Sequence, residues 1–337
     1  MAPMEELQQD NESQNPLLPV TGWGVDSAPF VDCCATQSLD LIGYPDHIPS
    51  IGGFSLGFLV CGSDDLVGRL TWGGKPVIWY KEKEYSGIAS EPHGNLPLYL
   101  KEEIQALRDR VPSIVSIISV GGASGVPLEV CETSVPKIVN EYKTMLQNYG
   151  FTHLDMNFED SIIHIPDALG RNIEAVKQLL AWKQDLRISY TLQVDTNGFN
   201  SDGKEFLKNL AGHEIVPDVI QPMLMYMGPT PVGKSEYDQC VSALDAVIKD
   251  VKNAWTKWTT QQIWDKLGLC PMFGKQIEQE IFTIDDMTKL LGLAQRQNVA
   301  MMSGWNVNHD SQGTPVTGTP QKPFQFSQIA AQYHRRD

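Results

Sequence analysis

Polar and apolar residues alternate near the middle of the chain, in a pattern that could serve acid–base chemistry. Asp155, Asn157 and Glu159 occupy every second position, and the places between them are taken by Leu154, Met156 and Phe158. A β-strand directs alternate side chains to opposite faces, so one face carries two carboxyls and an amide while the other is apolar. On a buried strand such a polar row is hydrogen-bonded or serves chemistry. An edge strand with one face in water is the alternative interpretation.

The segments around this row alternate between strand and helix patterns. Strands are predicted at 53–60, 114–120, 186–194, 218–227, 267–273 and 299–305, with a further extended segment within 20–31. Helical spacing of apolar residues is seen at 100–110, 135–149, 172–182, 204–210, 240–259 and 284–295. About eight strand–helix units in 337 residues favour an α/β fold, a single-domain (β/α)8 TIM barrel. A doubly wound open sheet is the alternative.

The predicted domain boundaries follow from these patterns. Residues 1–18 are expected to form a flexible N-terminal arm, and residues 19–312 the barrel. Residues 313–337 are expected to be a C-terminal tail or a final helix packed on the barrel. The segment 71–97, rich in Gly, Pro and Trp, is predicted to be a long loop.

Composition argues against several classes of partner and cofactor. The net charge of −15 disfavours nucleic acid and anionic membranes, and no apolar run is long enough for a membrane helix. The six cysteines are scattered without metal-ligand spacing, so we expect reduced thiols and no metal site. No glycine-rich nucleotide motif is present, and no cofactor is expected. The acidic N-terminal residues predict a cytoplasmic protein, or a secreted one if a leader was removed.

In a barrel of this kind the functional residues lie at the carboxyl ends of the strands. Glu159, Gly121, Tyr226 and Trp305 all fall at such ends. A carboxyl can protonate a leaving oxygen while an aromatic ring packs on the apolar face of a sugar. An oligosaccharide is therefore a candidate substrate.

Five motifs, in barrel order, resemble those of the family-18 glycoside hydrolases, the chitinase and endo-β-N-acetylglucosaminidase group. Asp155-Met-Asn157-Phe-Glu159 is similar to the DxDxE strand, and Ser119-Val-Gly121-Gly122 to the SxGG strand. The segments 53–60 with 71–74, 221–228 and 301–310 resemble the second, sixth and closing strands of the bacterial chitinase subgroup. The resemblance covers about residues 20 to 310.

The resemblance implies a substrate-assisted mechanism. Glu159 would be the general acid and base, and the substrate's 2-acetamido carbonyl would attack the anomeric carbon to give an oxazolinium. Asn157 stands where the family has the Asp that holds the acetamido N–H, and Asp155 matches the outer Asp that tunes this middle residue. Trp305 matches the tryptophan under the scissile sugar.

Two departures from the family pattern bear on activity. Asn157 is neutral, so it offsets less of the oxazolinium's positive charge than an Asp would. At the sixth strand, Tyr226 and Met227 replace the Asp-Tyr pair. The resemblance implies that the tyrosine of that pair steadies the acetamido oxygen. A one-residue slip would place Tyr226 in this role, although a slip reverses the facing of a strand.

Three functions follow as hypotheses, with a small-molecule or oligosaccharide substrate as the partner. The first is a weakened or diverged glycosidase acting on β-linked N-acetylglucosamine. The second is an enzyme of chitinase ancestry acting on a small, apolar metabolite, with Met223, Met225 and Met227 at strand spacing lining its pocket or simply packing in the core. The third is a non-catalytic, chitinase-like lectin that binds carbohydrate.

Overall fold

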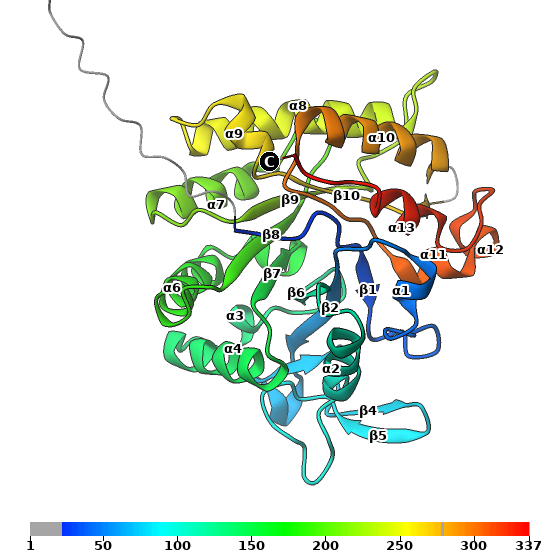
Figure 1. Ribbon diagram of the computed structural model, residues 1–337. Helices are drawn as coiled ribbons and strands as arrows, with labels where there is room; N and C mark the ends of the chain where they lie inside the picture. Colours follow the sequence, from blue (N-terminus) through cyan, green and yellow to red (C-terminus); the bar gives the residue numbers. More distant parts are fainter. Residues whose placement is uncertain (1–21, 278–279, 337) are drawn as a thin grey trace, which may run out of the picture.

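The computed structural model describes residues 22–277 and 280–336. The predicted arm at residues 1–18 lies outside the described residues. In the described part of the chain, the strands of the central sheet run parallel in the order β1-β2-β6-β7-β8-β9-β10-β13, with β3 antiparallel to β2 (Figure 1). The main helices lie around the outside of this sheet, as Figure 1 shows.

The sheet closes into a barrel because its two ends are joined by backbone hydrogen bonds. The N–H of Ala28 donates to the carbonyl of Met302 at 2.9 Å, and the N–H of Met302 donates to Asp26 at 2.8 Å. The N–H of Phe30 likewise donates to Gly304 at 2.9 Å. The predicted (β/α)8 barrel is confirmed, and the open doubly wound sheet is wrong.

The strands have these bounds: β1 Phe30–Asp32, β2 Gly53–Cys61, β3 Leu70–Trp72, β4 Val77–Tyr80, β5 Lys83–Ser86, β6 Val115–Gly121, β7 His153–Phe158, β8 Arg187–Gln193, β9 Val219–Leu224, β10 Gly268–Pro271, β11 Gly274–Ile277, β12 Glu280–Phe282 and β13 Met301–Met302. The helices are α1 Tyr44–His47, α2 Lys101–Arg110, α3 Leu128–Cys131, α4 Val135–Tyr149, α5 Asp160–Ile163, α6 Pro166–Trp182, α7 Ser201–Gly212, α8 Glu236–Ala254, α9 Thr260–Trp264, α10 Ile284–Gln297, α11 Val307–Gln312, α12 Thr314–Thr317 and α13 Gln325–Ala330.

The amphipathic helices form where the apolar spacing predicts them. The helix predicted at 135–149 matches α4, and Gly150 ends it in the left-handed conformation (φ 66°) that glycine adopts readily. The segment 71–97 is not wholly a loop. It includes the end of β3 and the β4–β5 hairpin, which projects from the barrel in Figure 1.

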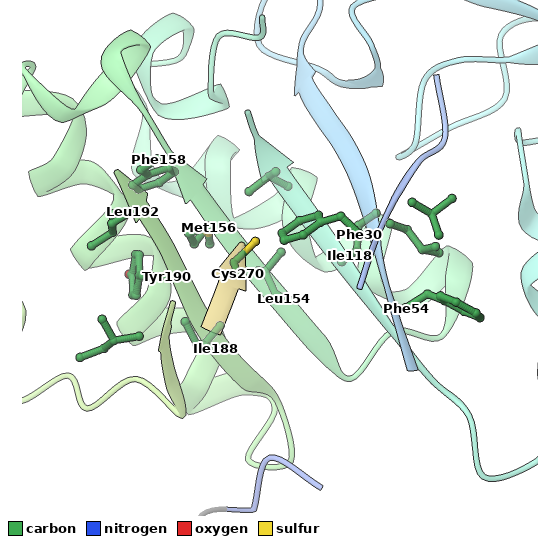
Figure 2. Packing of buried hydrophobic residues seen from close by; sticks show 14 of the residues in the cluster. Phe30, Phe54, Ile118, Leu154, Met156, Phe158, Ile188, Tyr190, Leu192 and Cys270 are labelled. Atoms are coloured by element: carbon green, nitrogen blue, oxygen red, sulfur yellow. The ribbon is translucent and has the colours of Figure 1, made fainter. Parts of the chain in front are cut away.

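The apolar face of β7 packs outward against the helices. Figure 2 shows Leu154, Met156 and Phe158 along this strand, beside the apolar side chains of β8. The sulfur of Met156 lies 3.9 Å from the hydroxyl of Tyr142 on α4 and 3.6 Å from the amide nitrogen of Asn172 on α6. The polar face of β7 therefore points into the barrel.

A separate apolar cluster lies where the barrel strands begin. Trp23 is buried and its indole N–H donates to the sulfur of Met301 at 3.2 Å. His153 donates through Nε2 to the carbonyl of Trp23 at 2.6 Å, and the two rings meet edge to face. His153 is thus a hydrogen-bonded core histidine, and burial lowers its pKa.

The chain after residue 312 forms two short helices, and α13 is held by a buried carboxylate. Asp310 accepts from the backbone N–H groups of Phe326 and Ser327, at 3.2 and 2.7 Å, and also from the Ser327 hydroxyl at 2.7 Å. These contacts fix the start of α13 to α11. No helix among residues 22–277 and 280–336 is long and apolar enough to cross a membrane.

Candidate active site

Asp155 braces three neighbouring strands inside the barrel. Its carboxylate accepts from the hydroxyls of Ser119 on β6 (2.6 Å), Ser189 on β8 (2.6 Å) and Thr191 on β8 (2.8 Å). Burial raises the pKa of Asp155 to about 6, although the three hydroxyl donors act in the opposite direction. Gln221 on β9 donates to Thr191 at 2.9 Å and extends the network.

Asn157 lines the cavity beside this network, and its side chain carries a buried, unpaired acceptor. The residue is buried, and its side-chain oxygen has no hydrogen-bond partner among the described residues. Its backbone is fixed, because its carbonyl oxygen accepts from the N–H of Gly122 at 3.0 Å. A buried acceptor left without a donor costs about 1–3 kcal/mol, so the arrangement suits a ligand that brings an N–H or O–H group.

Glu159 follows β7 directly and immediately precedes the short helix α5. Its carboxyl accepts from the side-chain amide of Gln193 on β8 at 3.3 Å. Burial, with a smaller contribution from the neighbouring Asp160 carboxylate, raises the pKa of Glu159 to about 7. A carboxyl of this pKa can both donate and accept a proton near neutral pH, which is what a general acid and base requires.

Glu159 and Asn157 open onto a cavity of about 640 Å³ at the carboxyl ends of the barrel strands. Exposed Asp160, Asp195 and Tyr226 form part of its wall, so the cavity opens to solvent there. Its full lining is Phe30, Phe58, Ala123, Asn157, Glu159, Asp160, Thr191, Gln193, Val194, Asp195, Asn200, Met223, Met225, Tyr226, Cys270, Met272 and Trp305.

Trp305 lines the same cavity as Glu159 and is held from two sides. Its indole stacks on Phe58, with centroids 5.3 Å apart and planes 14° apart, and lies 5.7 Å from the ring of Phe30. Its backbone joins the end of β10, because its N–H donates to Pro271 at 2.9 Å and its carbonyl accepts from Phe273 at 2.7 Å. The indole is a rigid platform on which a sugar ring can pack.

The structure places Tyr226 and Met227, which were predicted to end the sixth strand, in different surroundings. The strand predicted at 218–227 ends at Leu224 as β9, so Tyr226 and Met227 follow it in a loop. Tyr226 adopts a left-handed backbone (φ 54°) and lines the cavity from this loop. Met225 lines the cavity as well. Met227 lies outside it, beside a separate depression near α8, and packs in the hydrophobic core, which is the alternative given for it above.

Gly121 supports the site through the backbone rather than by lining the cavity. Its φ is 105°, and a Cβ there would lie 2.1 Å from the carbonyl oxygen of Asn157. Glycine is therefore required for β6 to end so close to β7. Ala123, two residues further on, lines the cavity instead.

Several residues that line the cavity were not predicted from the sequence. Gln193 touches Glu159, and Phe30, Phe58 and Met272 line the cavity near the indole. Gln193 was detectable in principle, because it stands at the end of a predicted strand that neighbours β7. Across the described ranges 22–277 and 280–336, no group of three or more His, Cys, Asp or Glu side chains could hold a metal ion.

Comparisons with known proteins agree with this architecture. No protein-family model matches the chain. The chain is 24% identical over 220 residues to Endochitinase 11 of Metarhizium anisopliae, an alignment that covers 62% of the chain and 42% of that protein. The chain spans less than half the length of the curated relatives it matches.

Solved structures define the class of fold. The crystal structure of active domain 2 of a chitinase from Pyrococcus furiosus, in catalytic-site mutants, superposes with a TM-score of 0.75 at 20% identity, covering 91% of this chain and 94% of that one. Human YKL-39, described as a pseudo-chitinase with retained chitooligosaccharide binding, superposes with a TM-score of 0.58 at 10% identity, covering 91% and 98%. The barrel therefore has the chitinase-like fold of glycoside hydrolase family 18.

Proposed function

We propose that the protein is a glycoside hydrolase acting on β-linked N-acetylglucosamine, with Glu159 as its general acid and base. The environment of Glu159 carries the proposal, because its carboxyl is buried, has a pKa of about 7 and faces the same cavity as Trp305. Burial is the means by which a carboxyl keeps a proton to donate at neutral pH. The likeness to chitinases adds support through the shared fold.

In the proposed reaction the substrate supplies its own nucleophile. Glu159 donates its proton to the glycosidic oxygen as the bond to the anomeric carbon breaks, and the carbonyl oxygen of the 2-acetamido group bonds to that carbon. The Glu159 carboxylate then takes a proton from a water molecule, which attacks the anomeric carbon and opens the oxazolinium. One acid therefore suffices, in keeping with a cavity in which Asn157 is neutral.

The unpaired oxygen of Asn157 fits the acetamido group. It would accept the acetamido N–H and so orient the carbonyl oxygen for attack. Asp155 does not supply this contact, because both oxygens of its carboxylate already accept hydrogen bonds, from the hydroxyls of Ser119, Ser189 and Thr191. We assign Asp155 to holding β6, β7 and β8 together beneath the reacting groups.

A second candidate function is favoured by the sulfur-rich part of the wall. Met223, Met225 and Met272 line the cavity, as a pocket for a compact apolar metabolite would require. The exposed Asp160 and Asp195 on the same wall favour a polar ligand, so the glycosidase is the better-supported function.

The Glu159→Gln variant tests the proposal. With a fluorogenic chito-oligosaccharide, we expect kcat to fall by at least about 100-fold, because the amide cannot donate the proton, while calorimetry shows that the oligosaccharide still binds. Glu205→Gln, on the outer helix α7 with its side chain 63% exposed, is the matched control and should keep full activity. If the wild type binds the oligosaccharide without any turnover, the protein is a lectin. If it neither binds nor cleaves the oligosaccharide, the enzyme acting on a small apolar metabolite becomes the better-supported function.

A further inference from the structure

Tyr226 reaches the cavity from a loop that gives its side chain little packing. The residue is 57% exposed and has a left-handed backbone, a conformation that costs a non-glycine residue about 1–2 kcal/mol. Burial and, to a smaller extent, the Glu159 carboxylate raise the pKa of its hydroxyl. Because the side chain is weakly packed, its position depends on what holds its backbone.

The side chain of Gln276 holds that backbone. Gln276 lies on β11, outside the cavity lining, and its side-chain oxygen accepts the backbone N–H of Tyr226. Its side-chain nitrogen donates to Glu236 at 2.8 Å. The oxygen and the nitrogen of the Gln276 amide therefore each make a hydrogen bond. The oxygen bonds to the loop after β9, and the nitrogen bonds to the first residue of α8.

Glu236 is itself fixed in place. It is 6% exposed and also accepts from the hydroxyl of Thr230, within the same loop. Gln239, one turn further along α8, donates to Thr230 at 3.1 Å and to the carbonyl of Gly228 at 3.1 Å. The loop after Tyr226 is thus tied to α8, and Gln276 ties Tyr226 to the same anchor.

We infer that Gln276 is a positioning residue, which holds the Tyr226 hydroxyl where it can donate a hydrogen bond to the substrate beside Glu159. This inference rests on the proposed function. Only an amide meets the requirement, because the side chain must accept from Tyr226 and donate to Glu236. A glutamate at 276 would keep the acceptor but place a second carboxylate against Glu236, and a methionine would provide neither bond.

The activity test exchanges the donor and acceptor side chains at positions 276 and 236. We expect Gln276→Met and Gln276→Glu each to lower kcat/KM on the chito-oligosaccharide by about tenfold or more, mainly through kcat, because a displaced substrate contact is felt in the transition state. Combining Gln276→Glu with Glu236→Gln keeps the acceptor for the Tyr226 N–H and restores the bond between side chains 276 and 236 with its direction reversed, so it should restore most of the activity. Gln105→Met, on the exposed side of α2, is the matched control.

A double-mutant cycle separates positioning from general destabilisation. If Gln276 acts through Tyr226, Gln276→Met should cost nothing further in a Tyr226→Ala background. Full additivity of the two losses, or a Gln276→Met variant as active as the wild type, would overturn the inference.

Hydrogen exchange gives a readout that does not depend on catalysis. The Tyr226 amide should exchange slowly in the wild type, faster in Gln276→Met, and slowly again in the exchanged pair. If the wild type cleaves no amino-sugar substrate, the proposed function fails, and the role assigned to Gln276 in catalysis fails with it, whereas the exchange rates still decide whether Gln276 holds Tyr226. Unchanged exchange in Gln276→Met contradicts that contact directly.

Discussion

Asn157 is the neutral residue in a row whose other two members, Asp155 and Glu159, are acids of raised pKa. A charge at position 157 would face the cavity from an already buried site. In the proposed reaction, a neutral Asn157 would stabilise the cationic intermediate less than an Asp, because a charge-assisted contact is about twice as strong as a neutral one. Position 157 is therefore where the proposed reaction can be tested by a single substitution.

Restoring the acid at this position should raise activity. We expect Asn157→Asp to increase kcat by about tenfold, since a carboxylate offsets the charge of the oxazolinium. Asn200→Asp is the matched control, because it adds the same charge to the cavity wall and still caps α7. No gain over the Asn200→Asp control, measured with the same oligosaccharide, would count against an acetamido contact at 157.

The pKa of Glu159 predicts the pH dependence of catalysis. The acid must be protonated to act, so kcat/KM should fall as pH rises above about 7. In Asn157→Asp the added negative charge raises the pKa of Glu159 further, and the alkaline limb of the profile should move to higher pH. A limb that stays in place would show that another group controls it.

At the scale of the elements, β7 runs from the Trp23 cluster at one end of the barrel to the cavity at the other. Its polar face carries Asp155 and Asn157, its apolar face packs on α4 and α6, and its first residue, His153, is hydrogen-bonded to Trp23. Trp23 thereby closes the end of the barrel opposite the cavity. The site is rigid because the strand that carries it is anchored along its whole length.

Removing the Trp23 side chain should loosen this end. Trp23 is 1% exposed, and truncation of such a side chain leaves a cavity, so Trp23→Ala should lower the free energy of unfolding by about 3–5 kcal/mol. Trp79, on the β4–β5 hairpin and 63% exposed, is the control, and Trp79→Ala should change stability by less than about 0.5 kcal/mol. Urea unfolding measures both, and equal effects would contradict the assigned role of Trp23.

At the scale of the whole molecule, the buried acids make stability depend on pH. Folding raises the pKa of Glu159 from 4.5 to about 7, so between these values the folded state binds more protons than the unfolded state. The free energy of unfolding therefore decreases as pH rises through this window. Asp155 acts in the same direction between 3.8 and about 6.

The Glu159→Gln variant isolates one of these contributions. Below pH 4 its free energy of unfolding should equal that of the wild type. Between pH 4 and pH 7 the variant should become progressively more stable than the wild type, and the difference should level off on the order of 3 kcal/mol. Thermal unfolding at a series of pH values measures the difference, and Glu205→Gln should show none of this trend. A variant less stable than the wild type at pH 8 would contradict the raised pKa.

The amino-acid sequence by itself determined the strand–helix alternation, the end of α4 at Gly150 and the two faces of β7, because each depends on local periodicity or on one residue's backbone freedom. It also placed Glu159 and Trp305 at strand ends, and the barrel brings such ends to one cavity. Only the tertiary structure decided that β9 stops at Leu224, that Tyr226 enters the cavity while Met227 leaves it, and that Gln193 touches Glu159. These features depend on which strands become neighbours and on a single left-handed residue, and neither leaves a periodic pattern in the sequence.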